Sequence, residues 1–183
     1  MQGSVLGPSL YITLESDLKP ISNINLIFKY ADDTNLLVPE CTDVQLCDEF
    51  DAILKWAEVN KMIVNTSKTK EIVFRRPNPR LHVDVMPLHG IEQVNEVKFL
   101  GVICSNNLRF DLHADFILKT CSQRSYIIRR FRDQGLAIKQ LTIVFDAIIL
   151  SRLMYASQAW SGFLSQELIY RIDKNTCVFK TYV

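Results

Sequence analysis

The period of the hydrophobic pattern changes once along this chain, and that change limits the fold more than any other feature. From Glu71 to Cys104 apolar residues alternate with polar ones, as in half-buried strands, and prolines interrupt the pattern. After Asn107 apolar residues recur at helical spacing, which predicts helices at about residues 113–133, 138–157 and 165–181. The predicted fold class is therefore α+β, with a mixed region over residues 1–110 and a helical region over residues 111–183.

Two adjacent aspartates lie between β-prone runs in the mixed region. The runs Asn25–Tyr30 and Asn35–Val38 flank Ala31-Asp32-Asp33-Thr34, and this order predicts a strand, a tight turn and a second strand. Aspartate suits such a turn because it hydrogen-bonds its own backbone. The simplest interpretation is a pair of solvated turn residues. However, the apolar flanks indicate buried strands that would hold both carboxylates rigidly, and paired hard oxygen ligands select Mg²⁺, with Mn²⁺ as the alternative ion.

Helices are predicted on both sides of this hairpin. Residues 4–18 have the composition of a mostly apolar helix. After the hairpin, Thr42 and Gln45 form a capping box, and apolar residues then recur with helical spacing until about Asn60. Further along, Lys98–Cys104 is predicted to be a strand.

Composition excludes several classes of protein. The apolar fraction of 48% and the charged fraction of 22% are those of an ordinary globular chain, so disordered and collagen-like classes are excluded. No run approaches the roughly 18 apolar residues of a membrane span, and no secretory signal is visible. The cysteines and histidines lack zinc-ligand spacing. We therefore expect an intracellular protein, cytoplasmic or nuclear, with reduced thiols, no membrane partner and no structural zinc.

Charge is balanced overall but not along the chain. Lys+Arg 21 against Asp+Glu 20 gives a net charge of +1, which by itself names no polyanionic partner. One segment of the helical region is nevertheless basic, and its bases are Lys119, Arg124, Arg129, Arg130, Arg132 and Lys139. Such a cluster is either a solvated helix face or a face that follows a phosphate backbone, and charge alone favours the solvated face.

Four sequence boxes occur in an order and spacing that a known enzyme family shares. They are Gln2-Gly3-Ser4-Val5-Leu6-Gly7-Pro8, Tyr30-Ala31-Asp32-Asp33-Thr34, Trp56 with Asn60, Asn65 and Lys68-Thr69-Lys70, and Phe99-Leu100-Gly101-Val102. Over nearly its whole length the chain resembles the reverse transcriptase (RNA-directed DNA polymerase) domain of non-LTR, LINE-type retrotransposons. Leu150, Leu153, Tyr155 and Trp160 are similar to the thumb pattern of that family. The resemblance implies an incomplete polymerase palm over residues 1–110 and a helical thumb over residues 111–183.

The resemblance also implies a reaction, namely RNA-templated DNA synthesis by nucleotidyl transfer with two Mg²⁺ ions. Asp32 would bind a metal ion directly and Asp33 would assist it. Lys68 would protonate the pyrophosphate as a general acid, with Lys70 as the neighbouring candidate, and a solvated lysine is the alternative interpretation of both.

Other positions are assigned to binding by the same resemblance. Gln2 and Gly3 would lie near the template and the nucleotide, and Tyr30 would pack beside the incoming nucleotide or the primer end. The hairpin of Phe99-Leu100-Gly101 would form the primer grip. Arginines of the thumb would contact phosphates of the duplex, and these are Arg124, Arg129, Arg130 and Arg132.

The implied partners are an RNA template with a DNA primer, or an RNA–DNA duplex, and deoxynucleoside triphosphates. In the thumb, Tyr126 and Phe131 are expected to pack in the core rather than to stack on bases. RNA maturases share the palm and are a weaker alternative, because the thumb pattern favours the LINE-type branch.

Parts of the family pattern are not found in this sequence. The family takes a third carboxylate from a strand upstream of the QGSVLGP box, together with fingers residues, and this sequence begins at the box. We therefore expect weak Mg²⁺ binding and little activity from the chain alone. We also expect an exposed sheet edge and apolar surface, covered by an N-terminal palm and fingers portion or by self-association. The alternative is a catalytically dead nucleic-acid-binding fragment or a decayed retrotransposon copy.

Overall fold

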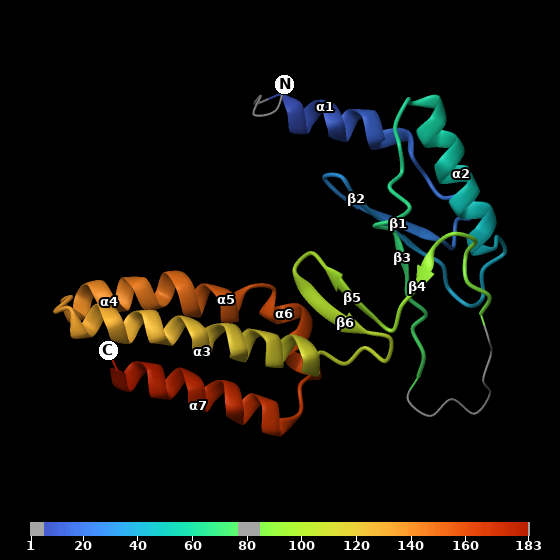
Figure 1. Ribbon diagram of the computed structural model, residues 1–183. Helices are drawn as coiled ribbons and strands as arrows, with labels where there is room; N and C mark the ends of the chain where they lie inside the picture. The colour runs from blue at the N-terminus through green and yellow to red at the C-terminus, as the bar shows by residue number, and fades with distance from the viewer. Residues whose placement is uncertain (1–5, 77–84, 183) are drawn as a thin grey trace. The chain divides into compact units, whose positions relative to one another are not determined.

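The structure is a computed structural model that describes residues 6–76 and 85–182 (Figure 1). Helices and short antiparallel sheets make up its regular structure, which confirms the α+β class. Its residues form two compact units. The hairpin unit contains the described residues up to Thr69 together with Pro87–Glu92, and the helical unit contains the described residues of Lys70–Met86 and those from Gln93 onward. Gln2 and Gly3 lie outside the described residues.

The hairpin unit contains two helices, a 3₁₀ turn and one antiparallel pair of strands. These are α1 (Gly7–Leu14), η1 (Glu15–Asp17), β1 (Leu26–Tyr30), β2 (Asp33–Leu37) and α2 (Leu46–Val59). Strand β1 pairs with β2 in a register that runs from Leu26 opposite Leu37 to Tyr30 opposite Asp33. The predicted strand, turn and strand are therefore confirmed, and only Ala31 and Asp32 lie between the paired residues.

The predicted capping box of α2 is wrong. Helix α2 begins at Leu46, and its N-cap residue Gln45 makes no capping bond through its side chain. The Thr42 hydroxyl is used elsewhere, because it donates to the Asn25 side-chain oxygen at 2.7 Å and accepts from the Val44 N–H at 3.2 Å. A tertiary contact with the segment before β1 has replaced the local cap.

The helical unit begins with short strands and continues as helices (Figure 1). Its strands are β3 (Lys70–Glu71), β4 (Glu92–Gln93, whose first residue belongs to the hairpin unit), β5 (Glu96–Phe99) and β6 (Val102–Ser105). Its helices are α3 (Asp111–Asp133), α4 (Ile138–Phe145), the π-helical turn η2 (Asp146–Leu150), α5 (Ser151–Met154), α6 (Ser157–Trp160), the 3₁₀ turn η3 (Ser161–Phe163) and α7 (Gln166–Tyr182).

The single strand predicted over Lys98–Cys104 is instead a hairpin. Strands β5 and β6 pair antiparallel, with Phe99 opposite Val102, so Leu100 and Gly101 form a two-residue turn. Both turn residues have positive φ, 44° at Leu100 and 86° at Gly101. Gly101 adopts such an angle at no steric cost, and it is the residue that permits the chain to reverse within an apolar run.

The core of the helical unit lies between α3 and the segment from α4 to α6. Its buried members are Phe110, Ile117, Cys121, Ile128, Leu141, Phe145, Ile149 and Trp160. The α3 members recur at helical spacing, as the sequence pattern predicted, so one face of this long helix is buried and the opposite face is left outside the core.

The long helix predicted over residues 138–157 is interrupted. After η2 and α5 the backbone becomes extended at Tyr155, with ψ of 120°, and then left-handed at Ala156, with φ of 49°. By length and composition alone, the 26 residues Ile138–Phe163 could cross a membrane, contrary to the expectation from the sequence. Inside a lipid bilayer, the backbone groups that a break in a helix frees need other partners within the protein. Because this stretch is broken and supplies core residues, we assign it to the core of the helical unit.

Candidate functional site

Asp32 and Asp33 lie at the tip of the β1–β2 hairpin, where both are exposed. Asp33 is the first residue of β2 and pairs with Tyr30, which is 65% exposed, while Asp32 occupies the two-residue loop. Ala31 completes the loop with φ of 51°, an angle that residues with a side chain rarely adopt. The hairpin therefore presents Tyr30 and both carboxylates at one exposed tip, and it does so through a strained turn.

The charge at this tip affects the pKa of a tyrosine in α1. Burial raises the pKa of Tyr11 to about 12, and its hydrogen bond to Glu15 and the negative charges of Glu15 and Asp32 act in the same direction. Glu15 and Asp32 thus act on one hydroxyl group, and the field beside the hairpin tip is negative. Sequence reasoning missed Tyr11 and Glu15, because nothing in an apolar helix signals a tertiary contact with a turn twenty residues away.

Lys29 fixes the same helix end to β1. Its ammonium group donates to the carbonyl oxygens of Glu15 and Leu18, the latter at 2.8 Å. These carbonyls lie in η1 and directly after it, and the Glu15 carbonyl also accepts from the Leu18 N–H at 3.1 Å. A lysine within the apolar run of β1 was the one available sequence signal, and its role is to join η1 to the strand that leads into the tip.

A buried carboxylate holds the segment that enters β1. Glu49 of α2 is 1% exposed and accepts hydrogen bonds from the Ile21 N–H at 2.9 Å, the Ser22 N–H at 2.8 Å and the Asn25 amide at 2.9 Å. Burial by itself would raise the pKa of Glu49, but these donors outweigh it and hold the pKa below its ordinary value. Glu49 therefore remains ionised and anchors the chain just before the hairpin.

Lys68 lies in a turn of the hairpin unit, and its side chain is exposed. Asn65 shapes this turn, because its side-chain oxygen accepts from the Lys68 N–H at 3.2 Å and from the Ser67 hydroxyl at 2.7 Å. The Asn65 backbone oxygen accepts from the Thr69 N–H at 3.0 Å. The asparagine and lysine of the third sequence box thus belong to one local structure, an Asx-type turn that presents Lys68 to solvent.

The donor set at the hairpin tip fits Mg²⁺ in kind. Asp32 and Asp33 are exposed hard oxygen ligands, and Mg²⁺ in proteins is commonly held by one or two carboxylates while phosphates and water complete its coordination. Within residues 6–76 and 85–182, no cluster of three or more His, Cys, Asp or Glu side chains could hold a metal ion. Asp32 and Asp33 thus supply two ligands of a kind that Mg²⁺ accepts.

The basic residues of α3 do not share one environment. Arg124 is half-buried and donates to the Ile148 carbonyl oxygen of η2 at 2.6 Å, so its guanidinium is engaged inside the helical unit. Arg129, Arg130 and Arg132 are exposed. The expectation that Tyr126 and Phe131 pack in the core is wrong, because they are 63% and 37% exposed and neither belongs to the core of the helical unit.

An exposed stripe runs along the face of α3 opposite the core. Its members are spaced alternately by four and three residues, and they are Leu112, Phe116, Lys119, Gln123, Tyr126 and Arg130. At one end, the Lys98 ammonium group of β5 lies 5.6 Å from the centre of the Phe116 ring. The stripe, which we call the α3 outer stripe, therefore interleaves aromatic and cationic side chains, the combination that follows a nucleic-acid strand.

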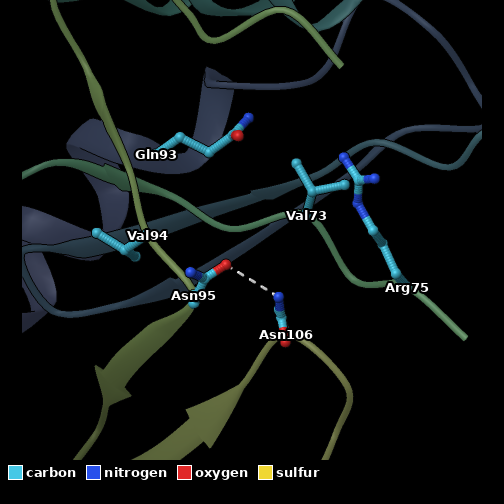
Figure 2. Close-up of a pocket in the computed structure, with 6 residues that line it drawn as sticks. All are labelled: Val73, Arg75, Gln93, Val94, Asn95 and Asn106. Atoms are coloured by element: carbon cyan, nitrogen blue, oxygen red, sulfur yellow. Dashed lines mark hydrogen bonds between the residues drawn. The ribbon is translucent and has the colours of Figure 1, made fainter. Parts of the chain in front are cut away.

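A polar recess of about 330 Å³ lies in the helical unit at the open end of the β5–β6 hairpin. Figure 2 shows two asparagines facing each other there, and the Asn106 amide donates to the Asn95 side-chain oxygen at 3.0 Å. Its lining residues are Val73, Arg75, Gln93, Val94, Asn95 and Asn106. None of the residues that the sequence assigned to the site belongs to this lining, whereas the predicted primer-grip residues Leu100 and Gly101 form the turn at the closed end of the same hairpin.

Comparison with known proteins agrees with the sequence boxes. Residues 1–104 match the family described as reverse transcriptase (RNA-dependent DNA polymerase). A probable RNA-directed DNA polymerase from transposon X-element of Drosophila melanogaster is 27% identical over 187 residues, covering 94% of this chain and 20% of that protein. The RNA-directed DNA polymerase from mobile element jockey of Drosophila funebris is 28% identical over 180 residues, covering 87% and 19%. The chain thus spans about one fifth of the length of these relatives. No solved structure matches it.

Proposed function

The chain belongs to the family of reverse transcriptases (RNA-dependent DNA polymerases), and from this premise we propose that it supplies the paired catalytic carboxylates for RNA-templated DNA synthesis. The observation that carries the proposal is the tip of the β1–β2 hairpin. Asp32 in its two-residue loop and Asp33 at the start of β2 are adjacent and exposed, inside the segment that matches the family. We propose the same partners as for the family, a template–primer duplex and deoxynucleoside triphosphates.

Asp32 and Asp33 are the residues that would hold Mg²⁺. The chemistry that the bound ion supplies in such a site is a lowered pKa for the attacking hydroxyl group and neutralisation of triphosphate charge. The contribution of the surrounding residues is to hold the β1–β2 hairpin in place. Lys29 and Glu49 hold the two ends of the segment that leads into β1, so the carboxylates keep their place without a bound ligand. The negative charge of Asp32 contributes to the raised pKa of Tyr11, and a bound cation would neutralise part of that charge.

Lys68 is the proposed proton donor to the leaving pyrophosphate. It lies in the hairpin unit with the carboxylates, in a turn that Asn65 stabilises by accepting hydrogen bonds from the Ser67 hydroxyl, from the Lys68 N–H and from the N–H and hydroxyl of Thr69. An exposed ammonium group on a fixed turn can approach a triphosphate from solvent at little conformational cost. Lys70 remains the neighbouring candidate.

The α3 outer stripe is the proposed nucleic-acid contact of the helical unit. Lys119 and Arg130 are eleven residues apart, which is about 16 Å along a helix, so they can reach phosphates a few nucleotides apart. Tyr126 lies between them and is exposed enough to contact a sugar or a base. We propose this face in place of Arg124, whose guanidinium is engaged with Ile148.

Primer extension on an RNA template with Mg²⁺ tests the proposal. We expect weak synthesis by the chain alone, because the described residues assemble no third carboxylate at the tip. Asp32→Asn should lower that synthesis by about 100-fold or more, since it removes a charged metal ligand. The matched control is Asp51→Asn, which changes an exposed aspartate of α2 in the same unit and should leave synthesis unchanged.

A measurement without catalysis accompanies this assay. Mn²⁺ added to the labelled chain should broaden the amide NMR signals of Asp33 and Thr34, and Asp32→Asn should abolish the broadening. If Mn²⁺ does not act at the tip and no variant synthesises DNA, while a template–primer duplex still binds, the chain is a nucleic-acid-binding fragment without polymerase chemistry. Synthesis that survives Asp32→Asn would refute the assignment of the carboxylates.

A further inference from the structure

Leu100, in the turn of the β5–β6 hairpin, has a backbone conformation that is unfavourable for a leucine. Leu100 has φ of 44°, an angle that a leucine adopts only when its surroundings impose it. The turn joins two strands of four residues each, and positive φ at both turn positions is the geometry that two-residue hairpins favour, although leucine adopts it at a steric cost. Contacts from outside the hairpin that offset this cost would stabilise the turn.

Tyr155 supplies such a contact at the turn itself. Its hydroxyl group donates to the Leu100 carbonyl oxygen at 2.8 Å, across 55 positions of sequence. Its ring lies against Gly101, where an added Cβ would approach the Tyr155 Cε1 atom to 3.4 Å. Both residues of the turn are thus in contact with one tyrosine, which bonds the Leu100 carbonyl and lies at van der Waals distance from the position that a Cβ would take at residue 101.

The break between α5 and α6 places this tyrosine. The backbone is extended at Tyr155 and left-handed at Ala156, so helix α5 ends at Met154 and Tyr155 lies outside the helix. The Trp160 indole N–H donates to the Tyr155 carbonyl oxygen at 3.1 Å, and Trp160 is only 2% exposed. A buried tryptophan therefore anchors the backbone of the residue that contacts the turn.

A second anchor holds strand β6. Phe99 and Val102 close the two-residue turn, so the next pair, Lys98 and Ile103, is of the non-hydrogen-bonded kind and the Ile103 N–H points away from β5. That N–H donates to Nδ1 of His113 in α3 at 3.3 Å. His113 is 2% exposed, and its ring meets the Trp160 ring edge-on at 5.2 Å between centres.

Tyr155, Trp160 and His113 therefore form one connected clamp. Two of its members bond the hairpin, at Leu100 and at Ile103, and the third contacts both of them. We propose that Tyr155 is a positioning residue of the polymerase reaction, whose hydroxyl group fixes the β5–β6 turn on the helical unit and thereby sets where that turn holds the primer terminus. The part of this proposal that concerns the primer rests on the proposed function, whereas the clamp does not.

Amide exchange of the chain, followed by NMR, tests the clamp. Tyr155→Phe removes the hydroxyl group and keeps the ring beside Gly101. We expect the amides of Val102 and Ile103 to exchange about five- to tenfold faster, the effect of losing one ordinary hydrogen bond. The control is Tyr170→Phe, which removes a hydroxyl group from a 66% exposed tyrosine of α7 in the same unit. Equal exchange in the two variants would overturn the clamp.

Strain at Leu100 gives a second, independent readout. If Tyr155 holds a strained turn, then Leu100→Gly, which adopts positive φ freely, should reduce the effect of Tyr155→Phe on exchange. We expect the acceleration in the Leu100→Gly background to be at most half of that in the natural chain. An undiminished acceleration would show that the hydroxyl group does not act on the turn.

The primer is tested with a template–primer duplex that carries 2-aminopurine at the primer 3′ end or at an internal position. Binding should change the fluorescence of the terminal probe, and Tyr155→Phe should reduce that change at least threefold while the duplex Kd stays within twofold and the internal probe is unaffected. An unaltered terminal signal would refute primer positioning even where the exchange result supports the clamp. If the natural chain binds no duplex, both the nucleic-acid part of the proposed function and primer positioning are refuted. The amide exchange measurements would still test the clamp.

Discussion

At the scale of single residues, buried charge does most to fix the hairpin unit. Glu49 is closed off from solvent, yet every donor around it, the Ile21 and Ser22 N–H groups and the Asn25 amide, favours the ionised carboxylate. Such an arrangement is costly to break, because loss of the charge leaves buried donors without an acceptor of equal strength. The segment before β1 therefore depends on one acidic side chain from α2.

Glu49→Gln should destabilise the hairpin unit by about 1–3 kcal/mol, because the new amide group places a donor against backbone N–H donors. The pKa of Glu49 is lowered in the folded chain, so its contribution is complete above the ordinary value of about 4.3 and is lost as pH falls through the lowered value. Urea unfolding at pH 7 and pH 3 should thus show a smaller pH dependence in Glu49→Gln.

The control for this prediction is Glu58→Gln, which changes an exposed glutamate of the same helix. It should alter stability by no more than about 0.5 kcal/mol. If both variants lose the same stability and keep the same pH dependence, Glu49 does not anchor the unit as an ionised group.

At the scale of elements, the two hairpins and the broken helix share one property, a residue other than glycine with positive φ. Ala31, Leu100 and Ala156 have φ of 51°, 44° and 49°. The first lies at the carboxylate tip, the second at the predicted primer grip, and the third presents Tyr155. Lys61 and Leu108 also have positive φ, so strained angles are not confined to the segments to which function was assigned.

Ala156→Gly should raise the melting temperature by about 1–3 °C, because glycine removes the steric cost of the left-handed angle at the end of α5. Ala159→Gly in α6 is the matched change at a helical position and should lower the melting temperature by a similar amount. Scanning calorimetry of the two variants measures both. Effects of the same sign would show that the angle at residue 156 carries no strain.

At the scale of the whole molecule, large apolar side chains are exposed on the sheet of the hairpin unit. The β1–β2 hairpin is a two-stranded sheet, and one of its faces exposes Leu26, Phe28, Tyr30 and Leu37 by 44% or more each. An isolated hairpin of this kind is marginally stable, and an apolar face beside a free strand edge favours association.

We therefore expect the chain to associate in solution, with an increase in sedimentation coefficient as its concentration rises. Phe28→Thr keeps a β-prone residue but removes the aromatic ring from this face, and it should weaken association about fivefold or more. Ile63→Thr is the control, because Ile63 is 97% exposed in a loop outside the sheet. Equal association of the two variants, or a monodisperse natural chain at every concentration, would contradict this role of the hairpin face.

The sequence by itself determined the features that depend on neighbouring residues. The change of period predicted the α+β class and the helix α3, and Asp32 with Asp33 could be recognised because a tight turn needs only local contacts. The turn at Leu100 and Gly101 was expected only from the family resemblance, because a run of apolar residues predicts one strand and does not reveal that Leu100 adopts positive φ.

Only the tertiary structure decided the contacts between residues far apart in the chain. The Thr42 hydroxyl donates to Asn25 instead of capping α2. Arg124 donates to a carbonyl oxygen of η2, and Tyr126 lies outside the core. The clamp of Tyr155 on Leu100 joins residues 55 positions apart. Local propensity is worth tenths of a kcal/mol per residue, whereas a buried charge or a satisfied carbonyl is worth about 1 kcal/mol or more, so the long-range contacts prevailed where the two disagreed.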